Sequence, residues 1–208
     1  MGDGAQVPGF TLISGKFPPM DLPTELLVSY RKQFAFYRQL GQAAMDQLSF
    51  QELVRDDEAG SNSIAVIVKH LAGNMRSRWT ELLTTDGEKP WRNREDEFAA
   101  DFADRAALQA AYDAGWTTLE TTLGELRPDQ LSEIVYIRNE GHTVFEAINR
   151  QLAHYGYHVG QIVLLAKQIR GADWKSLSIP RGASQAYNAG KFGEARGRRH
   201  FTDEWLRK

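Results

Sequence analysis

The 208-residue chain contains no cysteine. Disulfide bonds, thiolate metal ligands and a cysteine nucleophile are therefore excluded. Any metal ion that this protein binds must be held by histidine, by carboxylate side chains or by backbone oxygen atoms.

Long apolar runs and a strong charge of one sign are also lacking. No window approaches the roughly 20 apolar residues that a membrane-spanning helix needs. The N-terminal sequence lacks the basic start and apolar stretch of a secretory signal peptide, so we expect a cytoplasmic protein. The net charge of −2 indicates neither a nucleic-acid partner nor an anionic membrane surface.

The sequence does contain four long amphipathic segments, in which apolar residues recur at steps of three and four. The predicted helices span residues 23–48, 63–83, 104–126 and 143–170. Little of the remaining sequence favours strands, so we predict an all-α fold, a four-helix bundle. The loops after the second and third helices are long, and we expect at least one connection to cross the bundle.

The segments around these helices define the predicted domain organisation. Residues 1–22 are interpreted as an N-terminal arm, residues 23–171 as the bundle, and residues 172–208 as a C-terminal extension. Within the extension we predict a short helix near Ser184–Lys191. We interpret residues 51–62 as a loop, and residues 132–142 as a short strand or an extended crossover.

Capping signals mark the expected helix ends. One of the polar residues at 61–63 is predicted to cap the second helix, and Asp104 to cap the third. Thr143 and the glutamate three residues later form a capping box at the start of the last helix, and Gly171 closes its end.

His154 and His158 lie one turn apart on the last predicted helix. Residues four apart share one helix face, so both imidazoles can reach a single metal ion. The alternative is two partly buried histidines that hydrogen-bond to neighbours, but no acidic residue follows Glu146 in this helix. Gly156 and Gly160 each cost about 1 kcal/mol relative to alanine. Such a cost indicates close approach of another helix, a metal ion or a ligand.

His70 lies in the middle of the second predicted helix, between apolar and polar neighbours. A lone histidine in that position is usually a core residue with satisfied hydrogen bonds. Beside an independent histidine pair, it becomes a candidate third ligand from a facing helix. Three neutral imidazoles with one open coordination position form a catalytic rather than a closed structural arrangement, in which bound water ionises near neutral pH.

These motifs carry a resemblance to a known family. His70 in the sequence Ile-Val-Lys-His-Leu-Ala-Gly-Asn, followed by His154-Tyr-Gly-Tyr-His158-Val-Gly-Gln-Ile, resembles the DinB/YfiT-like superfamily of metal-binding four-helix bundles. The stretch Asp86–Arg94, together with Glu97 and Phe98, is similar to an uncharacterised DinB-like subfamily. The resemblance covers about residues 25–170.

The resemblance implies one divalent ion, for example zinc, nickel or iron, held by His70, His154 and His158. It also implies a homodimer and a small-molecule substrate. Characterised relatives include S-transferases and isomerases that use low-molecular-weight thiols such as mycothiol, bacillithiol or glutathione. We therefore expect a metal-dependent thiol S-transferase. The candidate residues for lining its cleft are Asn74, Ser77, Arg78 and Gln161.

Two other functions stay open at this point. A hydrolase that activates water would need a general base near the ion, and the candidate Glu81 lies about three turns from His70. A non-enzymatic, stress-related metal-binding protein is the second alternative. The Trp91–Arg94 loop could present cations to an anionic substrate or to the carboxylates of a thiol cofactor. Otherwise, salt bridges from it to Glu95, Asp96 or Glu97 would pin the loop.

Overall fold

The computed structural model describes residues 20–56 and 60–206. Residues 1–19 of the predicted N-terminal arm lie outside it. The described residues are mainly helical, with one small antiparallel sheet. No helix among them has the length and apolar character needed to cross a membrane.

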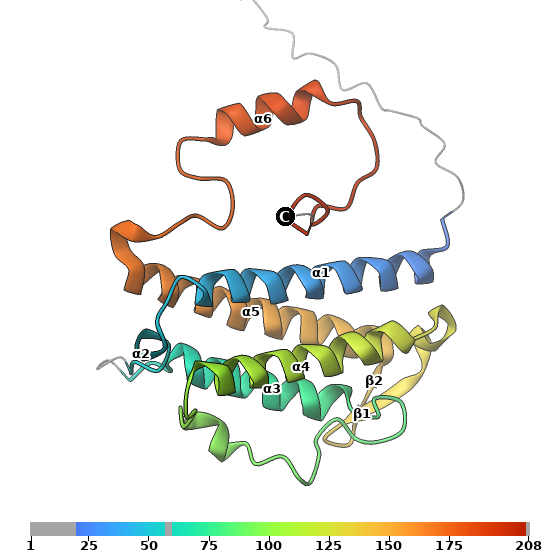
Figure 1. The fold of residues 1–208 in the computed structure, drawn as a ribbon. Helices are drawn as coiled ribbons and strands as arrows, with labels where there is room; N and C mark the ends of the chain where they lie inside the picture. The colour runs from blue at the N-terminus through green and yellow to red at the C-terminus, as the bar shows by residue number, and fades with distance from the viewer. Residues whose placement is uncertain (1–19, 57–59, 207–208) are drawn as a thin grey trace, which may run out of the picture.

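Four long helices carry the apolar stripes and bury them in one core (Figure 1). They are α1 (Leu22–Met45), α3 (Ile64–Trp79), α4 (Arg105–Glu125) and α5 (Val144–Arg170). Aromatic residues fill the centre of this core: Phe34, Trp79, Trp116 and Tyr155 are each at most 1% exposed. Edge-to-face and tilted ring contacts join these side chains across all four helices.

The four predicted helices are confirmed, with ends that differ by a few residues. Ser63 is the residue that caps α3, and Asp104 and Thr143 cap α4 and α5 as predicted. The second helix ends at Trp79 rather than at residue 83, because the chain turns away through Glu81 at a φ of 50°.

The helices form two pairs with parallel chain directions. Tyr30 bonds Asn149 and Tyr37 lies against Gly156, so α1 and α5 run in the same direction. Likewise, Thr122 near the end of α4 donates a hydrogen bond to the carbonyl of Trp79 at the end of α3, so these two helices also run in the same direction. The two pairs run antiparallel to each other (Figure 1). A parallel neighbour needs a long return connection, and residues 80–104 therefore run back along α3 before α4 begins.

The connections contain several shorter elements. They are α2 (Phe50–Leu53), η1 (Glu95–Phe98), η2 (Pro128–Ser132), β1 (Ile134–Ile137), β2 (Glu140–Thr143), η3 (Gly171–Asp173) and α6 (Ser184–Gly193). The helix predicted near Ser184–Lys191 is confirmed as α6. The prediction of a loop at 51–62 is wrong for residues 51–53, because Ser49 and Glu52 form a capping box that starts α2.

Residues 134–143 form a β-hairpin, so the strand interpretation of this segment is correct and the extended crossover is wrong. Arg138 and Asn139 occupy its tip at φ values of 57° and 63°, as a two-residue type I′ turn requires. The Asp86 carboxylate accepts hydrogen bonds from both of their backbone N–H groups. The hairpin tip is thus tied to the segment that follows α3.

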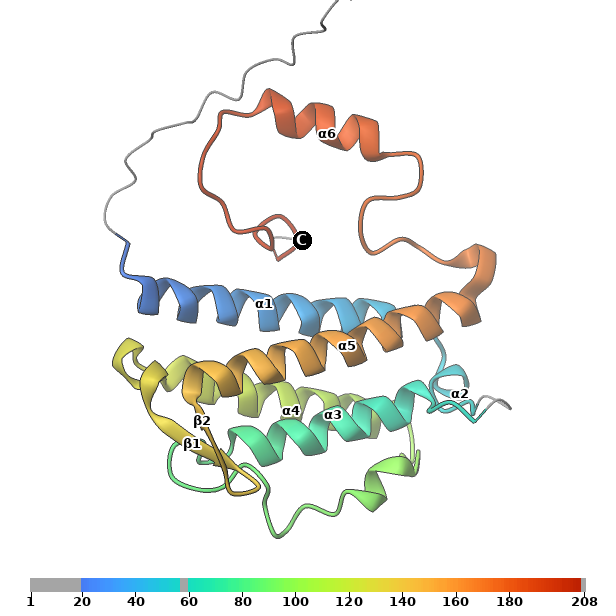
Figure 2. The same cartoon turned by 180° about the vertical axis from the view of Figure 1, so that it is seen from behind.

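The C-terminal segment lies over α1, on the side of the molecule away from α3 (Figure 2). Lys32 on α1 pairs with Asp203 at 2.6 Å, and Ser29 bonds His200 at 3.0 Å. Phe36 and Phe201 meet edge to face. These contacts fasten the end of the chain to α1, while α6 has no buried residue.

Candidate metal centre

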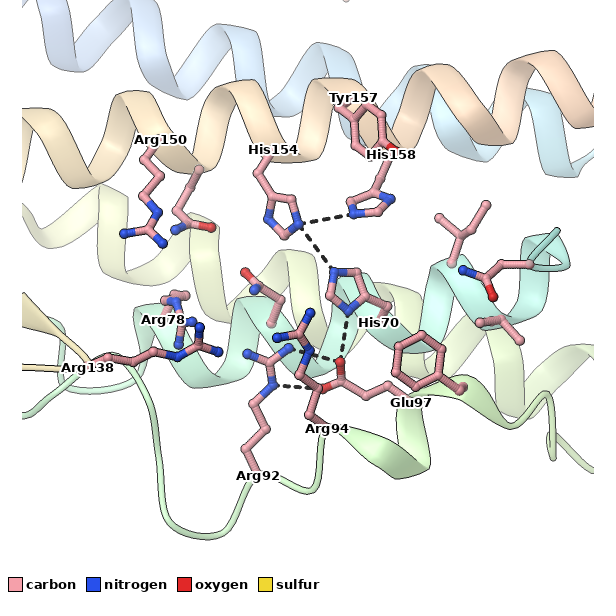
Figure 3. Close-up of a pocket in the computed structure, with 16 residues that line it drawn as sticks. His70, Arg78, Arg92, Arg94, Glu97, Arg138, Arg150, His154, Tyr157 and His158 are labelled. Carbon is pink, nitrogen blue, oxygen red and sulfur yellow. Dashed lines mark hydrogen bonds and ion pairs between the residues drawn. The ribbon is translucent and has the colours of Figure 1, made fainter. Parts of the chain in front are cut away.

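Three histidines meet between α3 and α5 (Figure 3). The Nε2 atom of His154 lies 3.2 Å from Nε2 of His70 and 3.1 Å from Nε2 of His158. One ligand atom from each ring fits within a common span of 4.8 Å. Four ligands at about 2.0–2.1 Å from a zinc-like ion are separated from one another by about 3.4 Å. The nitrogen separations are therefore close to those of a tetrahedral site.

Hydrogen bonds on the far side of two rings orient these nitrogen atoms. Nδ1 of His70 donates to the Glu97 carboxylate at 2.9 Å, and Nδ1 of His158 donates to Oε1 of Gln161 at 2.7 Å. The Gln161 amide is itself held by donating its Nε2 hydrogen to the Tyr157 hydroxyl. In each neutral ring the proton is thus on Nδ1, and the lone pair is on Nε2, facing the centre.

The three converging nitrogens are poorly satisfied by one another. His70 and His158 both present Nε2 lone pairs, while His154 has one Nε2 hydrogen at most and can donate to only one of them. A cation at the centre would satisfy all three lone pairs at once. The donor set therefore fits a divalent transition metal ion.

The electrostatic surroundings keep two of the rings neutral. Burial, together with the neighbouring His158 and His70 rings, lowers the pKa of His154 to about 3. Burial also lowers the pKa of His158. Desolvation disfavours a charged imidazole, and a neutral imidazole is the form that ligates a metal.

The carboxylate behind His70 belongs to a buried ion pair. Arg92 donates to both oxygens of Glu97, at 2.7 and 2.9 Å, and the two side chains are only 3% and 7% exposed. Burial alone would raise the pKa of Glu97, but the hydrogen bonds from His70 and Arg92 hold it below its usual value. Glu97 is therefore an ionised acceptor that fixes His70.

The return segment at 80–104 brings Glu97 to this position. The carboxylate lies directly against Gly73 on α3, where any larger residue would collide with it. Gly73 is one turn after His70, so its missing side chain makes room beside the ring. A glycine in a helix interior is costly, and here the cost accompanies the partner of a candidate ligand.

The histidines form part of the wall of a pocket of about 440 Å³ between α3, α5, the return segment and the hairpin. Val66, Ile67 and Phe98 supply apolar surface near the histidines. Five arginines reach the same pocket from four segments (Figure 3): Arg78, Arg92, Arg94, Arg138 and Arg150. The pocket has the size and the mixture of apolar and polar groups of a small-molecule site.

Residues 21–183 match a family model described as "Protein of unknown function (DUF1572)". The chain belongs to this family. Comparisons with curated proteins and with solved structures give no match. All of the histidines and arginines of the pocket lie inside the matched range, whereas α6 lies beyond it.

In this DUF1572 protein, two of the four residues predicted to line the cleft do so. Asn74 and Arg78 line the pocket, and Asn74 also accepts a hydrogen bond from the buried Tyr155 hydroxyl. Ser77 is fully buried and donates to the carbonyl of Gly87, away from the pocket. Gln161 contacts His158 rather than the pocket space.

The glycine argument for the histidine pair is only partly correct. A side chain at Gly156 would meet the ring of Tyr37 on α1, so this glycine marks close approach of a helix rather than of a metal ion. Gly160 faces open space, with no heavy atom within 4 Å of an added Cβ. The prediction of close packing at Gly160 is wrong.

Both interpretations of the Trp91–Arg94 loop have support in the structure. Arg92 forms the predicted salt bridge to Glu97, which pins the loop. Arg92 and Arg94 both line the pocket, so the loop also brings cations to it. The role of Glu97 as the partner of His70 was not anticipated from the sequence, although Gly73 one turn after His70 was a signal for it.

Proposed function

We propose that this protein is a DinB/YfiT-like four-helix bundle that holds one divalent transition metal ion on His70, His154 and His158. The supporting observation is the pair of outer hydrogen bonds, from His70 to Glu97 and from His158 to Gln161. They aim Nε2 lone pairs at one point, and such outer partners are a regular feature of histidine metal sites.

We further propose that the reaction is transfer of a low-molecular-weight thiol to an electrophile. A divalent ion at this site would lower the pKa of a coordinating thiol and so supply a thiolate nucleophile. Glu97 and Gln161 would keep His70 and His158 in the required orientation. The pocket beside the three nitrogens leaves room for a thiol compound and for the electrophile.

Hydrolysis is less well supported by the residues around the site. Among the described residues that line the pocket, Glu97 is the one carboxylate, and it is already engaged by His70 and Arg92. A carboxylate with a lowered pKa and three charged or polar hydrogen bonds is a weak general base. Glu81 lies past the end of α3 and does not line the pocket.

The test is elemental analysis of the untagged protein, followed by thiol-transfer assays on the wild type and on His154→Ala. We expect about one divalent ion per chain in the wild type and a loss of both metal and transfer in the variant. His200→Ala, in the C-terminal segment, is the matched control and should keep both. Absence of metal would refute the proposed centre. Metal without transfer of any common thiol would favour the non-enzymatic metal-binding protein.

A cytoplasmic location, a homodimer and the division into an arm at 1–22, a bundle at 23–171 and an extension at 172–208 remain part of this proposal. Light scattering on the purified protein tests the dimer directly. Limited proteolysis tests the division, because cleavage near residues 22 and 172 should leave a metal-binding core.

A further inference from the structure

The pocket has two chemically different ends. Residues at four-residue spacing line it in two rows: His70, Asn74 and Arg78 on α3, and His158, His154 and Arg150 on α5. Because α3 and α5 run antiparallel, the histidines of both rows lie at one end, and Arg78 and Arg150 lie at the other (Figure 3). Successive members of a row are about 6 Å apart along the helix axis. A ligand that spans this length meets both ends.

Positive charge is concentrated around the pocket, although the whole chain carries −2. Glu88 pairs with Arg78 at 3.1 Å and with Arg138 at 2.9 Å, and Glu97 pairs with Arg92. Within residues 20–56 and 60–206, Arg94 and Arg150 have no acidic partner at salt-bridge distance. Five guanidinium groups thus face two carboxylates, an excess of three positive charges.

The two arginines without an acidic partner come from separate parts of the chain. Arg94 belongs to the return segment and Arg150 to α5, where Nη1 of Arg150 lies 3.3 Å from Nε2 of His142. Both arginines are exposed and line the same pocket. A solvated run of charge would be local in the sequence, whereas the fold brings these two to one pocket. Guanidinium groups that converge on a concave site are the usual partners of carboxylate or phosphate groups.

A buried amide in the same wall also lacks a partner. Gln151 lines the pocket and is 4% exposed, and its Oε1 atom has no hydrogen-bond donor within the described residues. An unmade hydrogen bond at a buried acceptor costs about 1–3 kcal/mol. A ligand that brings an N–H or O–H group to Gln151 would remove this cost.

We propose that the pocket binds a small organic acid lengthwise, with its acidic group held by Arg94 and Arg150 and a hydrogen-bond donor on Gln151. The proposal rests on the proposed function in one respect, since the opposite end of the acid would lie at the three histidines. It defines the substrate or thiol cofactor as an anion. The arginine end can be tested whether or not the metal centre exists.

The experiment compares an acid with a neutral analogue of the same shape. Glutarate and glutaramide are titrated calorimetrically into the full-length wild type, both after chelator treatment and after incubation with zinc. We expect glutarate to bind at least about tenfold more tightly in both states. Arg94→Gln and Arg150→Gln should each weaken glutarate binding several-fold without changing glutaramide binding, because a charge-assisted hydrogen bond is lost in each variant.

Lys167→Gln is the matched control, since Lys167 is an exposed cation on α5 that does not line the pocket. It should preserve the preference for glutarate. Equal binding of glutarate and glutaramide to the wild type would overturn the proposal, as would an equal loss in Lys167→Gln and Arg150→Gln. Inorganic phosphate, titrated in the same way, determines whether the arginines favour a carboxylate or a phosphate.

The metal content of the same samples separates this proposal from the proposed function. A protein that holds no zinc but prefers glutarate, with the preference lost in Arg150→Gln, would refute the metal centre and support the acid pocket. A protein that holds zinc but binds glutarate and glutaramide equally would support the metal centre and refute the acid pocket.

Discussion

The two sides of α3 differ in how they meet their neighbours. Towards α4 the contact is close and apolar: a Cβ atom on Gly115 would lie 2.8 Å from the Cα atom of Ala72. Towards α5 the helices are separated by histidines, a pocket and buried polar groups. One helix therefore has a side that packs in the core and a side that forms the candidate metal centre and its pocket.

The forces on the two sides also differ. Packing of apolar surface holds α3 against α4. On the α5 side, hydrogen bonds add to the packing. The Tyr155 hydroxyl of α5 donates to Asn74 and accepts from Trp79, both on α3. Glu97 of the return segment accepts a hydrogen bond from His70. Substitutions on the α4 side should therefore change stability, and those on the α5 side should mainly change binding.

The largest expected effect is on the histidine side. Replacement of His154 by leucine removes the nitrogen that lies between the other two, and should weaken metal binding by more than about 100-fold, beyond the usual loss for an outer partner. The metal-free variant should be as stable as metal-free wild type to within about 1 kcal/mol, because an apolar group of similar size avoids burying a polar ring. Zinc titration and urea unfolding measure the two quantities. A variant that keeps zinc affinity would contradict the assigned ligand.

Gly115→Ala is expected to lower stability and to leave metal binding unchanged. The added methyl group meets backbone of α3 rather than a flexible side chain, so the variant should lose about 2 kcal/mol of unfolding free energy. Gly124→Ala, on the same helix with open space around it, should be neutral or stabilising by up to about 1 kcal/mol. Zinc affinity of the folded fraction should be unchanged in both. Equal stabilities for the two variants would show that the α3–α4 contact is looser than described.

A smaller effect on binding is expected from Glu97→Gln. The amide can accept from one donor group but cannot satisfy both Arg92 and His70 as the carboxylate does, so zinc affinity should fall roughly tenfold. Glu95→Gln, two residues away and exposed, serves as the control. If both variants bind zinc equally well, Glu97 has no part in orienting His70.

The sequence was informative about the residues that face the core. The third predicted helix is an example, because the apolar residues that recur along it at steps of three and four are all buried: Leu108, Tyr112, Trp116, Leu119, Leu123 and Leu126. Periodicity carries this information because each turn of helix returns the same face to the core. The proximity of His70 to His154 was also predictable. Two histidines four residues apart share one face of their helix, and His70 lies in the middle of another long helix that can pack against that face.

The partners supplied by connecting segments were not predictable in the same way. Glu97 and His70 are 27 residues apart, and only the parallel arrangement of α3 and α4 brings the return segment over His70. Gly156 was informative about proximity but not about the neighbour, which is Tyr37 of α1. Local pattern therefore defines which residues face inward, whereas the chemistry around a site depends on the path of the loops.

The smallest predicted effect tests how the hairpin supports the pocket side. Asp86 accepts hydrogen bonds from the backbone of Glu88, Arg138 and Asn139. Slight burial of the Asp86 carboxyl raises its pKa. The three hydrogen bonds together lower the pKa by more than burial raises it, so the pKa stays below the usual value of 3.8. The stabilisation is thus present above about pH 4 and is lost as the pH falls through the lower folded-state pKa.

Asp86→Asn should therefore cost about 1 kcal/mol at pH 7, a value kept modest by solvent screening of this partly exposed carboxylate. The difference in unfolding free energy between variant and wild type should shrink as the pH falls below 4. Wild-type Asp86 is then increasingly protonated, and its side chain becomes neutral like that of asparagine. Urea unfolding at pH 7 and pH 3 measures this difference. Since Arg138 sits at the hairpin tip and lines the pocket, the same variant should loosen the arginine end while the histidine end keeps its zinc affinity. A variant that loses zinc and acid binding together would show that the two ends of the pocket are held as one unit.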